Sequence, residues 1–366
     1  MQLEAGLRKH DDGKDRNSPM RRGGGWSGTV TGTNSYERWV KLIALGSFGC
    51  WMLFVMFYWR GSMAPAAPSG AATKTAAKQT KDFNLEPSIE DGFPEETNFL
   101  AFGDYGTGDE SQWKVAKALE EFAATLDPPP AFVLSTGDQI YDHGIGNHDC
   151  EGSIDAMLQY AEQKQSVWFM PRRYYTIDRP VAPKTILRLV VIDACDLVCG
   201  HEPRDERCNG RMNEQSSVAT RKEQYEWIEQ MLSAGKPAGV EQMWTIVMGH
   251  WGVYSYAGNA DTPELINVLD PLLKKYRVHA YFNGHDHCMQ HIRKVDDDGW
   301  TRNYFISGAG GYRIHELQPK ARAKPDLVHA AMTHGFMSVH MTKTLFRVQL
   351  VDDTGEILYT TDVQHD

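Results

Sequence analysis

The sequence predicts an α/β protein, with strands and helices alternating along the chain. Two observations carry this prediction. Short apolar runs of strand length are separated by segments with helical spacing, and four of the apolar runs end in Gly-Asp or Gly-His. Uniformly apolar strands that are separated by helices indicate βα units around a sheet that is covered on both faces. The content of 41% hydrophobic and 11% aromatic residues is ordinary for a globular protein.

The first part of the pattern lies before residue 195. An apolar run at 98–104, "NFLAFGD", is followed by helical spacing at 110–126, and a second run at 131–138, "AFVLSTGD", again ends in Gly-Asp. A third run, "ILRLVVIDA", occupies 186–194. These segments predict three strands and the helix between the first two.

The second part continues the alternation and then changes period. The elements expected there are a helix at 221–232, a strand at 244–250 that ends in Gly-His, a helix at 264–276, a strand at 278–287, and the apolar run 304–311. The tail at 337–363 alternates with period two around the turn "DDTG". This alternation predicts antiparallel hairpins that complete the fold.

An uninterrupted apolar stretch precedes all of these elements. Residues 42–59, "LIALGSFGCWMLFVMFYW", carry no charge and are flanked by Arg38, Lys41 and Arg60. Eighteen helical residues rise about 27 Å, close to the ~30 Å hydrocarbon core of a bilayer. A buried soluble helix is seldom apolar on every face at this length, and a cleaved signal peptide has a shorter apolar region nearer the N-terminus. We therefore expect a transmembrane signal-anchor.

The anchor divides the chain into four parts. Residues 1–41 form a polar head, 42–59 the anchor, and 60–82 a stalk of mainly Ala, Pro, Ser, Thr and Lys, which lacks the apolar surface to fold. The folded body spans 83–366. The basic residues before the anchor weakly favour a cytoplasmic N-terminus, so we expect a single-pass membrane protein whose body lies outside the cytoplasm, in the secretory pathway, the vacuole or lysosome, or at the cell surface.

Charge and cysteine content exclude several classes of protein. The formal charge of −10 does not fit a nucleic-acid-binding protein, which needs clustered Lys and Arg. An anionic substrate would need a local positive charge, and a metal centre would supply it. Six cysteines are too few for a disulfide scaffold. Cys50 lies in the anchor, so at least one of the other five is unpaired within the monomer, and a bridge among Cys195, Cys199 and Cys208 would fit an oxidising compartment.

Polar residues with metal-binding side chains stand where apolar runs end. In open α/β sheets, ligands bind at the carboxyl ends of the strands. One such residue is more often a cap or a turn former, but several in succession indicate a metal site. The residues concerned are Asp104, Asp138, Asn147, His250, His285 and His287.

The donor set predicts two ions rather than one. Two carboxylates, an amide, a phenol and three imidazoles are too many ligands for one tetrahedral zinc. They suit two ions about 3.5–4 Å apart that share a bridging carboxylate. The phenol is Tyr141, and a phenolate is a hard anionic donor that suits a trivalent ion such as iron. Taken alone, Tyr141 is equally well explained as a half-buried tyrosine.

Five short motifs resemble, in this order, those of the metallophosphoesterases. The motifs are "GDYG" at 103–106, "GDQIY" at 137–141, "GNHD" at 146–149, "GH" at 249–250 and "GHDH" at 284–287. The tyrosine of the second motif is similar to that of the purple acid phosphatases, especially the small tartrate-resistant form. The resemblance extends from Asn98 to Val363. It implies a four-layer α/β/β/α sandwich with a dinuclear metal site at the strand ends.

The resemblance also implies roles for individual residues. Fe(III) would be held by Asp104, Asp138, Tyr141 and His287, and a divalent ion (Fe, Zn or Mn) by Asp138, Asn147, His250 and His285, with Asp138 bridging. His148 would face the substrate and protonate the leaving oxygen, and Asp149 would orient its ring. The implied activity is that of an acid phosphatase, in which a metal-bound hydroxide attacks a small phosphate monoester.

The sequence departs from the family pattern in two places. The position nine residues beyond His250 usually holds a second histidine and is Asn259 here, which could bind phosphate but could not deliver a proton. Leaving-group chemistry would then fall on His148, or on His143 or His201. The second departure is the link 142–146, where a helix and a strand normally separate the two metal loops. Five residues reach ~20 Å and can join the loops, but they cannot contain a βα unit.

The short link predicts that one βα unit is missing, which would leave an unpaired sheet edge and exposed apolar surface. A skipped exon or a gene-model error would produce such a link. Besides the phosphatase, two further functions fit the sequence. One is a phosphodiesterase or nucleotide pyrophosphatase with two divalent metals. The other is an anchored, catalytically impaired variant. The sequence leaves the oligomeric state open.

Overall fold

A computed structural model describes residues 92–139, 141, 149–150, 152–163, 168–200, 208 and 216–365. The predicted head, anchor and stalk lie outside these residues, as does the link 142–146. Within the described ranges no helix is both long and apolar enough to cross a membrane.

Two sheets organise the described chain. The first has the strand order β12-β11-β10-β1-β2 and the second the order β3-β4-β5-β6-β8-β7-β9. The strands of the first sheet are β1 (Thr97–Phe102), β2 (Val133–Ser135), β10 (Gly335–Met341), β11 (Phe346–Asp352) and β12 (Ile357–Val363). Those of the second are β3 (Tyr175–Ala182), β4 (Thr185–Val191), β5 (Gln242–Met248), β6 (Ala280–Asn283), β7 (Met289–Val295), β8 (Thr301–Ser307) and β9 (Leu327–Ala331).

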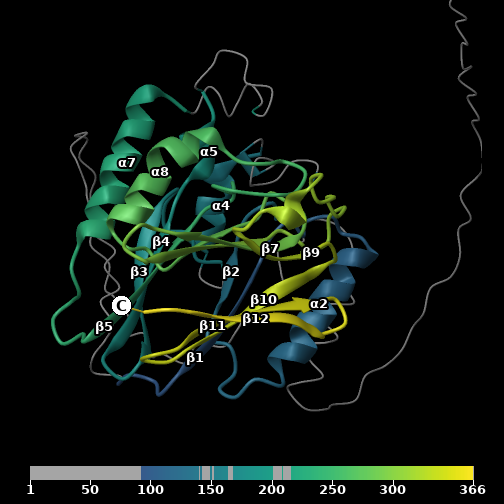
Figure 1. Ribbon diagram of the computed structural model, residues 1–366, viewed down its shortest axis with the longest axis horizontal. Coiled ribbons are helices and arrows are strands. Elements are labelled where there is room, and N and C mark those ends of the chain that lie inside the picture. The colour runs from purple at the N-terminus through teal and green to yellow at the C-terminus, as the bar shows by residue number, and fades with distance from the viewer. Residues whose placement is uncertain are drawn as a thin grey trace, which may run out of the picture. The chain divides into compact units, whose positions relative to one another are not determined.

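The helices lie on the outer faces of the two sheets. They are α2 (Glu110–Ala123), α4 (Ile154–Ala161), α5 (Ala194–Val198), α7 (Val218–Ser233), α8 (Pro263–Lys275) and the short 3-10 helix η2 (Ala321–Ala323). Side chains cap several N-termini: the Asp109 carboxylate accepts from two amides of α2, and Ser217 and Thr220 form a capping box on α7. Figure 1 shows α5, α7 and α8 gathered on one side of the strands and α2 on the other.

Three hydrophobic cores correspond to the spaces between four layers. Leu100 and Phe336 pack with α2, Phe99 and Trp244 lie in the core between the sheets, and Val190 belongs to the core under the other helices. The predicted four-layer α/β/β/α sandwich is therefore confirmed. The expectation that the apolar strands are covered on both faces is also confirmed, because each sheet packs one face against helices and the other against the second sheet.

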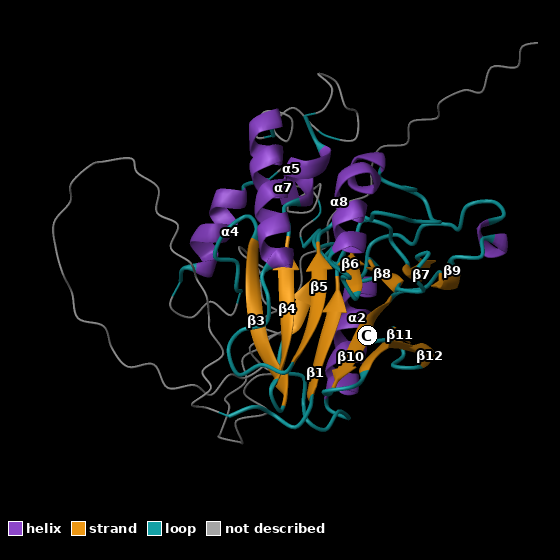
Figure 2. Cartoon of the chain, turned by 60° about the vertical axis from the view of Figure 1, so that its left-hand side comes forward, coloured by secondary structure: helices purple, strands orange, loops and turns teal. Residues whose placement is uncertain are grey.

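The predicted elements are mostly present, and several unpredicted ones complete the second sheet and its cover. The three long helices and the C-terminal hairpins lie where the spacing predicts them. The elements that the sequence did not predict are β3, β7, β9, α4, α5 and η2. β3 is an edge strand that contains Pro180 and lacks a clean alternation, while α4 has only eight residues. Figure 2 shows β3, β4 and β5 side by side.

The unpaired edge that the short link predicts is present within the described chain. β2 has three residues and stands at the end of the five-stranded sheet, where it pairs with β1 alone. The strand that the family pattern places between the two metal loops would extend this edge. The carboxyl end of β2 nevertheless leads directly to Asp138, so the metal loop keeps its place at the end of the strand.

Two disulfides lie around α5. Cys199 pairs with Cys208, which confirms a bridge among the three neighbouring cysteines, and Cys195 pairs with the distant Cys150, which the sequence did not reveal. Cys288 is a buried free thiol, in agreement with the expected unpaired cysteine. Disulfides persist in oxidising compartments.

Candidate metal centre

The expected ligands meet at one edge of the two sheets. Asp104 follows β1, Asp138 follows β2, His250 follows β5, and His285 and His287 follow β6. Since β1 and β2 are parallel, and β5 and β6 are parallel, their carboxyl ends lie at common edges. Residues separated by up to 183 positions in sequence are thereby brought together from the two sheets.

The two carboxylates and one imidazole form a compact, buried group. Ligand atoms of Asp104, Asp138 and His287 all lie within 4.8 Å of one another. Asp104 and Asp138 are 0% and 1% exposed. Both have a positive φ, 59° and 48°, as does His285 at 68°. A left-handed backbone is costly for residues other than glycine and persists where the surrounding structure enforces it, often at functional sites.

Hydrogen bonds fix which ring nitrogen each histidine presents to the centre. His250 donates from Nδ1 to the carbonyl oxygen of Thr136 at 2.9 Å, and His287 donates from Nδ1 to that of Arg313 at 2.9 Å. In both rings Nε2 is therefore the nitrogen available to a metal, as in metal-bound histidines whose other nitrogen bonds a carbonyl. His250 Nε2 lies 3.3 Å from His285 Nδ1. Two nitrogens bound at about 2.0–2.1 Å to one tetrahedral ion would be ~3.4 Å apart.

The phenol of Tyr141 points into the same centre. Its oxygen lies 3.3 Å from Asp104 Oδ1 and 3.2 Å from His287 Nε2. The ring stacks on Tyr312 with a centroid distance of 3.9 Å and meets His287 edge to face. Tyr312 is itself held to the site, because its backbone N–H donates to the carbonyl oxygen of Asp104.

Burial makes the negative charges of the centre unfavourable without a cation. Desolvation raises the pKa of Asp104, and desolvation followed by the charge of Asp138 raises the pKa of Asp149 well above its usual range. Burial likewise raises the pKa of Tyr141. His250 also loses solvation, which favours its neutral form, yet the charges of Asp138 and Asp104 raise its pKa to about 9. A bound cation would stabilise all of these anionic groups, so the donor set fits a metal centre.

Gly137 is required for the position of His250. Its φ is +105°, and a Cβ atom there would lie 2.5 Å from His250 Nδ1. Gly137→Ala should therefore displace the ring and lower the affinity for the divalent ion at least ~10-fold, measured by titration of metal-free protein. Gly108→Ala is the matched control, because Gly108 has a φ of +70° and no atom within 4 Å of the added Cβ. Equal metal affinities in the two variants would contradict this prediction.

Asn259 occupies the position at which the family pattern has a second histidine. Asn259 donates from Nδ2 to the carbonyl oxygen of His285 at 2.7 Å and from its backbone N–H to Asp286 at 2.8 Å. His315 lies in the same corner: its Nδ1 is 2.9 Å from Asp286, and its ring stacks on His287 with centroids 4.0 Å apart. Sequence analysis missed His315, because it belongs to no motif and follows the last predicted ligand by 28 residues.

Part of the predicted site lies outside the described residues. This applies to Asn147, His148 and the two alternative proton donors, His143 and His201. Asp149 is described: it is fully buried, and its Oδ1 accepts a hydrogen bond from the backbone N–H of Gln139 at 3.1 Å. The His148 ring, which is its other expected partner, lies outside the described residues.

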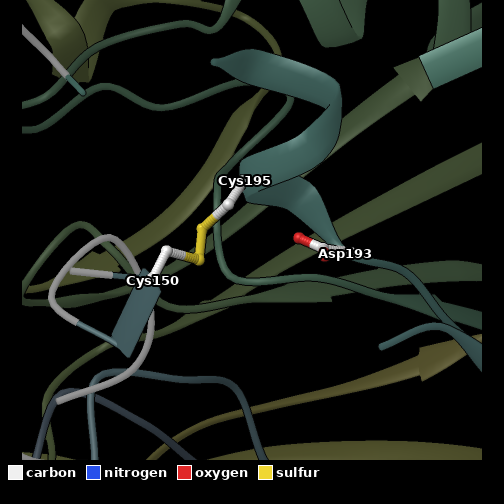
Figure 3. A group of neighbouring side chains, drawn as sticks. All are labelled: Cys150, Asp193 and Cys195. Atoms are coloured by element: carbon white, nitrogen blue, oxygen red, sulfur yellow. A yellow bond between two sulfur atoms is a disulfide. The ribbon is translucent and has the colours of Figure 1, made fainter. Parts of the chain in front are cut away.

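A second cluster of residues with potential metal-binding side chains is not a metal site. Cys150, Asp193 and Cys195 lie together, but Figure 3 shows the two sulfurs bonded to each other. A disulfide offers no thiolate ligand. The Asp193 carboxylate accepts from Arg173 Nε at 2.6 Å and from the Asp196 N–H at 3.1 Å, so this cluster is structural.

Comparisons with known proteins place the chain in a family. The family model for calcineurin-like phosphoesterases matches residues 84–289. Purple acid phosphatase 4 of Arabidopsis thaliana is 26% identical over 350 residues, which cover 87% of this chain and 94% of the relative. Human tartrate-resistant acid phosphatase type 5 is 25% identical over 321 residues, 76% of this chain and 94% of the relative.

A solved structure shares the fold. It is GAP50, described as the anchor in the inner membrane complex of Plasmodium, with a TM-score of 0.60 and 20% identity over 75% of this chain and 90% of that one. The similarity to purple acid phosphatases, which are phosphoric monoester hydrolases, is confirmed by the curated relatives. The chain belongs to the calcineurin-like phosphoesterase family.

Proposed function

We propose that this chain is a dinuclear metal acid phosphatase that hydrolyses small phosphate monoesters. The observation that carries the proposal is the convergence of two buried carboxylates, three imidazoles and a phenol from four strand ends. Asp104 and Asp138 are buried close together. In the described chain their ion-pair partners are histidines, with no lysine or arginine among them. Two buried carboxylates in this setting need a cation. The activity implied by the curated relatives fits such a centre.

The distances support a division of the ligands into two groups. Tyr141, Asp104 and His287 have donor atoms 3.2–3.4 Å apart, and His250 lies 3.4 Å from Asp138 and 3.3 Å from His285. We assign the first group to Fe(III) and the second, with Asn147, to a divalent Fe, Zn or Mn. Asp138 belongs to both groups as the bridge. A phenolate favours the trivalent ion, which accounts for Tyr141 in the first group.

The bound ions would polarise the phosphate and supply a hydroxide from coordinated water near neutral pH. The residues of the chain orient the reactants around them. His250 and His287 are held by carbonyl oxygens so that their Nε2 atoms face the centre. We assign leaving-group protonation to His148, which is worth ~10²–10⁴ in rate. Asn259 lies beside His285 as a neutral group at the edge of the site.

Visible absorption tests the iron assignment. Protein purified with two metals per chain should hydrolyse an aryl phosphate and absorb visible light through the Tyr141 phenolate. Tyr141→Phe should lose this absorption, and a chelator should remove both absorption and activity. Tyr312→Phe is the matched control, because it keeps the ring stacked on Tyr141 and changes a hydroxyl outside the ligand set. A colourless, fully metallated and active protein would instead support the divalent-metal phosphodiesterase.

A second candidate function is that of an anchored, catalytically impaired protein. The observations that favour it are Asn259 at the usual histidine position, the short link 142–146, and the shared fold with a protein described as an anchor. This candidate predicts no hydrolysis of aryl phosphates even with two metals bound. Hydrolysis above the level of an Asp138→Asn variant would exclude it.

We further propose that residues 42–59 anchor the body, 83–366, on the extracytoplasmic side of a membrane through the stalk 60–82. The apolar length of the segment and the two disulfides support this arrangement. Alkaline extraction of the full-length protein tests it. Release of the intact chain into the soluble fraction would contradict the anchor.

A further inference from the structure

His315 and Tyr312 contact two proposed ligands of Fe(III) without being ligands themselves. They lie in the loop that follows β8, beyond the last metal-binding motif. His315 stacks on His287, and Tyr312 stacks on Tyr141. We infer that the segment 312–315 positions the His287 ring and the Tyr141 phenol for the metal ion. The inference rests on the proposed dinuclear site.

The His287 ring is held by three residues of this segment. Its Nδ1 donates to the carbonyl oxygen of Arg313 at 2.9 Å, the ring stacks on His315 with centroids 4.0 Å apart, and Tyr312 meets it edge to face at 4.9 Å. The backbone is held as well, because the His315 N–H donates to the His287 carbonyl oxygen at 3.0 Å. With these contacts in place, Nε2 of His287 lies 3.4 Å from Asp104 Oδ1. The segment therefore determines which way the ligand nitrogen faces.

The plane of the Tyr141 ring is set by its contact with Tyr312. The two rings are stacked with their centroids 3.9 Å apart and their planes 14° apart. A stack of this kind restricts rotation of the phenol. A phenolate absorbs visible light through charge transfer to a bound iron, and this transition depends on how the ring and the ion are oriented. The absorption band therefore reports the contact between the two rings.

The segment is itself tied to the metal centre. The Tyr312 N–H donates to the carbonyl oxygen of Asp104 at 3.0 Å. His315 Nδ1 lies 2.9 Å from Oδ1 of Asp286, a 3% exposed residue that stands between two histidine ligands. A Cβ atom on Gly258 would lie only 2.9 Å from His315 Cγ, so the ring has no room to shift on that side. The support of the ligands is therefore as well fixed as the ligands themselves.

The two stacked rings contribute little to the hydrophobic core. Tyr312 is 37% exposed, and the His315 side chain is 24% exposed. Aromatic rings stabilise a fold mainly through the area that they bury, so this exposure limits their contribution. The faces that they do bury lie against Tyr141 and His287. We therefore expect loss of either ring to affect the metal site more than the stability of the fold.

Replacement of His315 tests the inference. In protein purified with iron, His315→Ala should lose iron to a chelator at least ~10-fold faster than the parent and shift the visible absorption band, because residues that orient a ligand typically change metal affinity by this much. His315→Phe keeps a ring that can stack on His287, so both properties should stay close to those of the parent.

His329→Ala is the matched control. His329 is also partly exposed, and it stacks on a tyrosine, Tyr359, with centroids 4.5 Å apart, but it contacts no proposed ligand. This variant should keep the iron and the absorption band of the parent. Thermal unfolding of the metal-free proteins should change no more in His315→Ala than in the control, which separates a positioning role from a general loss of stability.

Each outcome decides the inference. Iron loss and absorption in His315→Ala that match the control would overturn it, and so would a His315→Phe variant that behaves like His315→Ala. If His315→Ala does not fold, Tyr312→Leu removes the other stacked ring, and an unchanged absorption band there would have the same consequence. If the parent holds no iron, the proposed iron site fails, and amide hydrogen exchange of the metal-free proteins across 284–288 still decides. Exchange at least ~10-fold faster in His315→Ala than in the control would support the positioning role, and equal exchange would exclude it.

Discussion

Replacing Asp138 with asparagine should reduce kcat/KM for an aryl phosphate at least ~10³-fold, equivalent to about 4 kcal/mol of transition-state stabilisation. Asparagine has nearly the same shape, but it lacks the charge that would bridge the two proposed cations. Asp138 is 1% exposed and lies 3.4 Å from His250 Nε2, so water cannot readily replace the lost carboxylate. The measurement is steady-state kinetics together with the metal content of the purified variant.

The same substitution should raise the thermal stability of the metal-free protein. The charge of Asp138 raises the pKa of Asp149 and contributes to the raised pKa of Asp104, after desolvation in both cases. A neutral side chain removes this repulsion, so activity and stability should change in opposite directions. Asp155→Asn, at an exposed carboxylate in the first turn of α4, is the control and should change neither. Undiminished activity in Asp138→Asn would contradict the proposed bridge.

The ligands could be predicted because each one ends an apolar run. Asp104 and His250 follow strands that are mostly buried on both faces, and Asp138 follows the partly buried edge strand β2. Parallel strands place the residues that follow them at the same edge of the sheet. Residues that are far apart in the sequence therefore lie close together in space. The layer order could not be derived from periodicity, because an apolar strand looks the same whether a helix or another sheet covers it.

Other parts of the site carry no local signal. His315 reaches His287 through a loop whose course depends on tertiary contacts, and Cys150 finds Cys195 across 45 residues. Spacing cannot specify such a pairing, since several connectivities are compatible with the same cysteines. The short link was visible in the sequence, and the unpaired edge at β2 follows from it. The Cys150–Cys195 disulfide became apparent only in the structure.

Acid should destabilise the fold through two buried histidines away from the metal centre. Burial and then the neighbouring His365 lower the pKa of His279 to about 3, and burial lowers that of His291 to about 4. Both rings must be neutral, because one nitrogen of each ring accepts a hydrogen bond. His279 Nδ1 accepts from the Thr245 N–H, while His291 donates from Nε2 to Asn303 Oδ1 and accepts from the Tyr359 hydroxyl. Protonation would break one accepted bond in each case.

The direction of the effect follows from linkage. The folded pKa values lie below the unfolded value of about 6.5, so the unfolded state binds more protons between these limits. Stability is therefore fully present above about pH 6.5 and is lost as the pH falls toward 4 and then 3. Two such groups give a slope of up to ~2.7 kcal/mol per pH unit, as a ceiling. Denaturant unfolding of metal-free protein between pH 7 and pH 5 measures it.

Variants at and beside His291 distinguish the effect of its protonation on stability from the effect of losing a contact. His291→Gln can keep a donor to Asn303 and an acceptor for Tyr359 while removing the titrating group, so the slope should fall by about one proton, ~1.4 kcal/mol per pH unit. Tyr359→Phe removes the 2.9 Å hydrogen bond to His291 but leaves the imidazole in place, so stability should fall with the slope retained. An unchanged slope in His291→Gln would contradict the prediction.

The buried neutral histidines bear on the pH range in which the protein stays folded. An acid phosphatase works below neutral pH, where protonation of these histidines lowers the stability of the fold. Metal ions that bind only the folded state would offset that loss of stability.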